Sequence, residues 1–91
     1  MKTFLFLNKT INITLVEPSL SRVEVDNLIY NVYLPKYTLE HSHIIIHELW
    51  HLFTDILSTF DDGMVSLDIL AKDVYAYLFD SLYREVLECV L

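Results

Sequence analysis

Hydrophobic and polar residues alternate in the first third of the chain, which is the pattern of half-buried β-strands. The clearest alternation is the run Ile11, Asn12, Ile13, Thr14, Leu15. Residues 2–7 are rich in strand-forming types, and Asn8-Lys9-Thr10 is typical of a turn. These features predict a β-hairpin at the start of the chain.

Two further strands are predicted before residue 36. Pro18 and Ser19 end the second strand, and residues 22–25 form a short alternating segment. Asp26-Asn27 is typical of a second turn, and residues 28–34 are β-branched and aromatic up to Pro35. The pattern predicts a small, mainly antiparallel sheet of three or four strands.

After Pro35 the hydrophobic spacing changes to that of helices. Thr38 is a suitable N-cap for a helix that runs to about residues 58–60. Asp61-Asp62-Gly63 predicts a break, and a second helix is expected from about residue 65 to residue 90. The expected fold class is therefore α+β, with a sheet followed by two long helices in one domain over residues 1–91.

The first predicted helix divides into an apolar and a polar face. The apolar stripe, which we expect to form the core contact, consists of Ile45, Ile46, Leu49, Trp50, Leu52, Phe53, Ile56, Leu57 and Phe60. The polar face consists of His43, His47, Glu48, His51, Asp55 and Ser58. Any chemistry on this helix is thus expected on its polar side.

The polar face carries the motif His47-Glu48-Leu49-Trp50-His51, which has the form H-E-x-x-H. Histidines four residues apart on a helix share a face and can bind one metal ion, most often Zn²⁺. Glu48 can act as the general base that takes the proton of an attacking water. The alternative interpretation is an ordinary solvated helix face that is rich in histidine.

A catalytic zinc site needs a third protein ligand. Asp68 is a candidate because it lies at the margin of the apolar stripe of the second helix, where an unpaired carboxylate is costly. Asp68 could equally be a first-turn residue that interacts with the helix dipole. The other candidates are Asp55, His43, and the loop residues Asp61 and Asp62.

The chain resembles a minimal zincin, and more narrowly the short phage-type proteins related to ImmA/IrrE metallopeptidase domains. The matching stretches are residues 44–51 and residues 68–75, within a resemblance over roughly residues 28–80. Zincins of this sort often use Glu as the third ligand, where this chain has the shorter Asp68. The extended motif with a further Gly and His is absent.

The resemblance implies a small zinc metallopeptidase that cleaves a specific protein or peptide. His47, His51 and Asp68 would hold the zinc, and Glu48 would be the catalytic base. His43, His41 or Tyr75 would stabilise the oxyanion. The substrate is expected to pair as an extended peptide with a sheet edge, with residues 28–34 as the candidate strand.

Composition limits the partners. The net charge of −7 argues against binding to nucleic acid phosphates. The apolar run at residues 4–7 is too short for a signal peptide, and no segment approaches the length of a membrane span, so a cytoplasmic location is expected. A hydrophobic content of 54% in 91 residues favours a homodimer or a protein partner.

A second hypothesis belongs to a different functional class. An acidic, phage-like protein could bind and inhibit another protein without catalysis, with the histidine face as solvent or interface. A degenerate zincin that keeps zinc only for folding lies between the two hypotheses.

Overall fold

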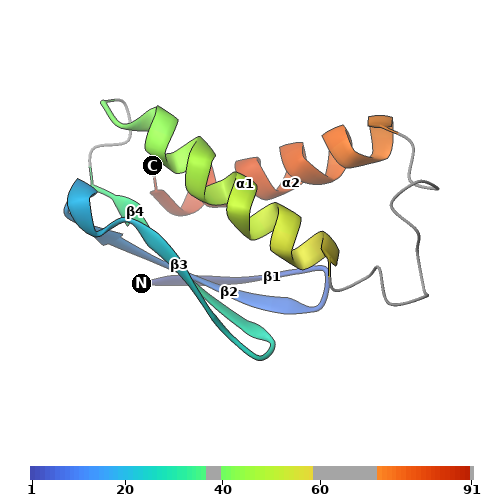
Figure 1. Ribbon diagram of the computed structural model, residues 1–91, viewed down its shortest axis with the longest axis horizontal. Helices are drawn as coiled ribbons and strands as arrows, with labels where there is room; N and C mark the ends of the chain where they lie inside the picture. The colour runs from blue at the N-terminus through green and yellow to red at the C-terminus, as the bar shows by residue number, and fades with distance from the viewer. Residues whose placement is uncertain (37–39, 59–71, 91) are drawn as a thin grey trace.

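The computed structural model describes residues 1–36, 40–58 and 72–90, without the side chains of residues 72–75 and 90. It contains the strands β1 (Lys2–Phe6), β2 (Lys9–Val16), β3 (Arg22–Asp26) and β4 (Ile29–Pro35). A short 3-10 helix, η1 (Pro18–Leu20), separates β2 from β3. The helices α1 (Ser42–Ser58) and α2 (Lys72–Val90) follow the sheet, which confirms the predicted α+β class (Figure 1).

The four strands form one sheet in the order β1-β2-β4-β3. β1 pairs with β2 and β3 pairs with β4 in antiparallel hairpins, whereas β2 and β4 are parallel. On the face of the sheet away from the helices, Thr3 donates a hydrogen bond to Asn12, and Asn12 donates one of 3.1 Å to Asn31. This polar row connects β1, β2 and β4.

Residues with positive φ form both hairpin turns. Leu7 (φ 49°) and Asn8 (φ 66°) join β1 to β2, and Asn27 (φ 57°) lies between β3 and β4. Asparagine tolerates the left-handed region better than most residues, which explains why the sequence marks these turns. Leu7 has no such preference, but its side chain packs at the edge of the core.

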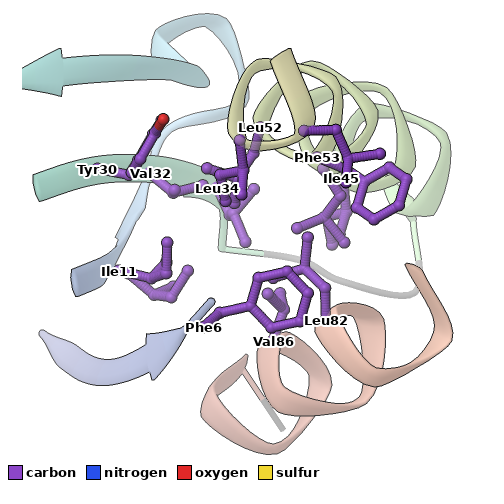
Figure 2. Close-up of a cluster of buried hydrophobic side chains, with 14 residues drawn as sticks. Phe6, Ile11, Tyr30, Val32, Leu34, Ile45, Leu52, Phe53, Leu82 and Val86 are labelled. Atoms are coloured by element: carbon purple, nitrogen blue, oxygen red, sulfur yellow. The ribbon is translucent and has the colours of Figure 1, made fainter. Parts of the chain in front are cut away.

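Both helices cover the same face of the sheet (Figure 1). α1 lies over β4 and β3, and α2 lies over β1 and β2. The core between the helices and the sheet consists of Phe6, Ile11, Ile13, Tyr30, Val32, Leu34, Ile45, Leu49, Leu52, Phe53, Ile56, Leu57, Leu82 and Val86 (Figure 2). The alternating residues of β2 and β4 therefore face the helices as the period-2 pattern predicts.

Two members of the predicted apolar stripe are not core residues. Ile46 is 46% exposed and Trp50 is 55% exposed. The Trp50 ring packs against Phe53 and Phe79, with centroids 6.0 and 5.6 Å away, but half of its surface remains exposed. The buried part of the stripe is therefore narrower than predicted.

The start of α1 also differs from the prediction. α1 begins at Ser42, where the amides of Ile44 and Ile45 donate to the carbonyl oxygen of His41. Its predicted N-cap, Thr38, lies outside the described residues, as does Phe60 at its predicted end. The predicted start of the second helix near residues 65–68 also lies outside them. Across the described ranges, no helix has the length and apolarity needed to cross a membrane.

Candidate metal and catalytic site

His47 and His51 lie one turn apart on α1, with both side chains exposed. Their Nε2 atoms are 3.0 Å apart, and their rings meet edge to face with centroids separated by 4.5 Å. The helix from Ser42 to Ser58 contains no Gly or Pro, so its regular geometry brings the two rings together. Both histidines of the predicted metal pair are thus adjacent in space.

This spacing fits a shared zinc ion. Two imidazole nitrogens at about 2.0–2.1 Å from a tetrahedral zinc are roughly 3.3 Å apart. The 3.0 Å separation of the Nε2 atoms is close to that value. Without a metal, the same separation is a hydrogen bond in which one ring nitrogen donates and the other accepts. A chelate would replace this hydrogen bond, with both Nε2 atoms unprotonated and turned toward the ion.

Glu48 follows His47 and is half-buried on the flank of α1. Within the described ranges no residue forms a hydrogen bond or ion pair with its carboxylate, which leaves both oxygens available as proton acceptors. One residue corresponds to about 100° of helical rotation, so Glu48 points to a different side from the two imidazoles. This arrangement suits a base that acts beside a metal without ligating it.

The third predicted ligand lies outside the structural description. Asp68 falls in the segment 59–71, and Tyr75 lies in α2 with a side chain that is not described. Among the residues that the structure describes, no group of three His, Cys, Asp or Glu side chains is arranged to hold a metal ion. His43 is exposed one turn before His47, and its ring centroid lies 6.4 Å from that of His41. The described residues thus include two candidate metal ligands and the candidate base.

Asp55, an alternative third ligand from the sequence, has another partner. Its Oδ2 accepts a hydrogen bond of 2.8 Å from the hydroxyl of Tyr30 on β4. The Tyr30 ring is buried in the core with its hydroxyl at the margin (Figure 2). Burial, and secondly the hydrogen bond to Asp55, raise the pKa of Tyr30, so the hydroxyl keeps its proton and remains a donor. Asp55 is therefore held toward the sheet and not toward the imidazoles.

A groove of about 420 Å³ lies beside His51, between α1 and the sheet. It is lined by Val23, Val25, His51, Thr54, Asp55 and Ser58. The two valines belong to β3, which is an edge strand of the sheet. The sequence did not reveal this groove, because Val23 and Val25 read simply as strand residues and their contact with α1 depends on the strand order.

The strand order also corrects the expected peptide-binding edge. Residues 28–34 correspond to β4, which is paired with β2 on one side and with β3 on the other. β4 therefore has no free edge to offer to a peptide. The edge strand that borders the candidate site is β3.

Comparisons of the chain with protein-family models, with curated proteins and with solved structures found no match.

Proposed function

We propose that the chain is a small zinc-dependent metallopeptidase. The observation that supports this proposal best is the approach of the His47 and His51 Nε2 atoms to 3.0 Å on an exposed helix face. His51, one member of that pair, also lines the groove that β3 and α1 border. Two neighbouring imidazoles, a carboxylate without a partner among the described residues and an edge strand are parts of the site that zinc-assisted peptide hydrolysis requires, and a third ligand would complete it.

In this proposal His47, His51 and Asp68 hold the zinc ion. The zinc supplies Lewis acidity, which polarises a peptide carbonyl and makes water more acidic. Glu48 takes the proton of the attacking water and returns it to the leaving amine. His43 or Tyr75 stabilises the negative charge on the carbonyl oxygen.

The substrate is a specific protein or peptide in an extended conformation. Among the described residues, β3 pairs only with β4, so its outer backbone groups can pair with an added strand. An extended segment bound along β3 would pass close to His51, because His51 lines the same groove as Val23 and Val25 of β3. This edge replaces the strand at residues 28–34 in the peptide-binding role.

Metal content tests the proposal first. Protein without a histidine tag is purified and its zinc is measured by elemental mass spectrometry, together with the variants His47→Ala, His51→Ala and His43→Ala. We expect about one zinc per chain in the wild type, loss of zinc in the first two variants and retention in His43→Ala. The third variant controls for the loss of one imidazole from the same helix. A metal-free wild type, or zinc that persists in His47→Ala, would contradict the proposal.

A second candidate function is an acidic binding protein without catalysis. The exposed Ile46 and Trp50 on α1 favour it, because neighbouring exposed apolar residues are common at protein interfaces. This function depends on neither Glu48 nor zinc chemistry. Wild type and Glu48→Gln would then behave alike in every assay, and no peptide would be cleaved at any zinc concentration.

A further inference from the structure

The groove between β3 and α1 has two chemically different walls. Val23 and Val25 form an apolar wall on the helix-facing side of β3, and Val25 is 52% exposed. Thr54, Asp55 and Ser58 form a polar wall on the last turns of α1. A ligand in this groove would contact hydrocarbon on one side and polar groups on the other.

Hydrogen bonding within α1 leaves a single charged acceptor on the polar wall. The Thr54 hydroxyl donates to the carbonyl oxygen of His51 at 3.1 Å, and the Ser58 hydroxyl donates to that of Asp55 at 2.7 Å. Asp55 accepts the Tyr30 hydroxyl through Oδ2 only, so within the described ranges its Oδ1 has no partner. The two hydroxyls have used their donors and can only accept, so the charged group of this wall that can still bind a ligand is the carboxylate oxygen.

Asp55 is also oriented by a hydrogen bond, and no cation pairs with it among the residues that the structure describes. Its partner Tyr30 is 1% exposed, so the hydrogen bond to this rigid side chain orients the carboxylate. The described ion pairs use other carboxylates: Arg22 with Glu24, Lys36 with Glu17, and Arg84 with Asp80. In a chain with a net charge of −7, Asp55 is thus an oriented anion without a described counter-ion.

We propose that this groove is a subsite for a lysine or arginine side chain of the peptide substrate. The aliphatic stem lies along Val23 and Val25, and the cationic head pairs with the free oxygen of Asp55. This inference rests on the proposed peptidase function and adds a specificity to it: substrates with a basic residue close to the cleaved bond.

The chemistry of the groove disfavours other side chains. A purely apolar side chain would cover the Asp55 carboxylate without replacing its lost water, which is costly. An acidic side chain would be repelled by Asp55. A basic side chain with a long hydrocarbon stem matches both walls.

Peptide hydrolysis tests the preference directly. A set of peptides whose other residues are neutral carries either lysine or norleucine at each position in turn. Norleucine is the comparison because it has a straight apolar stem without the charge. At the position that enters the groove we expect kcat/KM to be about fivefold higher for lysine, as for a partly exposed ion pair. Asp55→Asn, whose amide oxygen can still accept from Tyr30, should bring this ratio close to one. Asp80→Asn removes the same charge from α2 and should retain the ratio.

Binding provides a readout that does not depend on turnover. ¹⁵N NMR spectra of the zinc-loaded Glu48→Gln protein are recorded during titration with the best lysine peptide and with its norleucine counterpart. We expect larger shifts of the Val23, Val25 and Thr54 amides, at lower concentration, with lysine than with norleucine. Equal responses to the two peptides would overturn the subsite.

The two experiments separate failure of the subsite from failure of the peptidase. Hydrolysis at equal rates for lysine and norleucine at every position would overturn the subsite and leave the peptidase intact. Lysine-selective shifts without any hydrolysis by the wild type would overturn the peptidase and support the subsite. If Asp55→Asn fails to fold, the comparison of lysine and norleucine peptides with the wild-type protein still decides whether the subsite exists.

Discussion

His47, Glu48 and His51 show how one turn of helix separates two chemical roles. The four-residue spacing brings the two imidazoles to an Nε2–Nε2 distance of 3.0 Å. The one-residue offset turns Glu48 away, so its carboxylate lies beside the pair as a half-buried group. In the proposed site, a metal ion and a base would therefore act on one water molecule without competing for the same position.

The first prediction concerns Glu48. Replacement by Gln keeps the shape of the side chain but removes the proton acceptor, so we expect kcat for peptide hydrolysis to fall by at least about 100-fold. Zinc content should remain at one per chain, because Glu48 is not a ligand in the proposed site. Glu85→Gln, an exposed position on α2, is the matched control and should keep the wild-type rate. A fully active Glu48→Gln enzyme would refute the assigned role.

A second prediction concerns the hydrogen bond between Tyr30 and Asp55. Tyr30→Phe removes a donor that contacts a charged acceptor at 2.8 Å. Water can partly replace this donor because Asp55 is exposed, so we expect a loss of about 1 kcal/mol in the free energy of unfolding at pH 7. Urea unfolding followed by circular dichroism measures this value.

The same residue gives a pH dependence. The pKa of Tyr30 is raised in the folded protein, whereas in the unfolded chain it is about 10. Above pH 10 the unfolded state loses this proton first, so the folded state binds more protons and its stability falls with rising pH, by at most about 1.4 kcal/mol per pH unit. Tyr30→Phe should flatten this decline between pH 10 and pH 11. An unchanged slope in the variant would mean that Tyr30 is not the group responsible.

At the scale of elements, the β1–β2 turn provides a third prediction. Asn8 has a φ of 66° and is exposed, so a β-branched residue there is strained without any gain in packing. We expect Asn8→Val to lower the free energy of unfolding by about 1–2 kcal/mol, and Asn8→Gly to leave it unchanged or raise it by up to about 1 kcal/mol. Thermal unfolding of the two variants makes the comparison, and equal melting temperatures would argue against a left-handed turn.

The same elements show what local sequence can and cannot specify. Asn8 and Asn27 marked both hairpin turns, and the alternation at Ile11 and Ile13 marked the buried face of β2, because these are local preferences. The parallel pairing of β2 with β4 depends on contacts between distant segments, and no local pattern encodes it. For this reason a free edge was expected at residues 28–34, whereas the two outer strands of the described sheet are β1 and β3.

In the candidate site, too, features within one helix could be predicted from the sequence, and contacts between distant segments could not. The H-E-x-x-H spacing placed His47 and His51 together, since both lie on one helix. The contribution of Tyr30 to the position of Asp55 could not be predicted, because the two residues are 25 positions apart and meet only through the packing of α1 on β4.

At the scale of the molecule, the proposed zinc site would connect α1 with the segment that contains Asp68. A ligand that binds only the folded state stabilises it, by about 2.7 kcal/mol at 100 times the dissociation constant. We therefore predict that zinc raises the melting temperature of the wild type, and that a chelator reverses the effect. Asp68→Asn should abolish the zinc-dependent increase, and Asp80→Asn should not. If Asp68→Asn responds like the wild type, the third ligand is a different residue, which the same assay can locate among the other acidic positions.

The parallel contact between β2 and β4 also bears on how the chain folds. Each antiparallel hairpin closes over a two-residue turn, whereas Asn12 and Asn31 on the parallel pair are 19 positions apart. Contacts between distant positions carry the larger loop-closure entropy, so we expect the joining of the two hairpins to limit the folding rate. Asn31→Ala should then slow refolding in stopped-flow experiments more than Asn8→Val does at equal loss of stability. The β3–β4 hairpin, which carries one of the two outer strands of the sheet, would thus join the β1–β2 hairpin at the slowest step of folding.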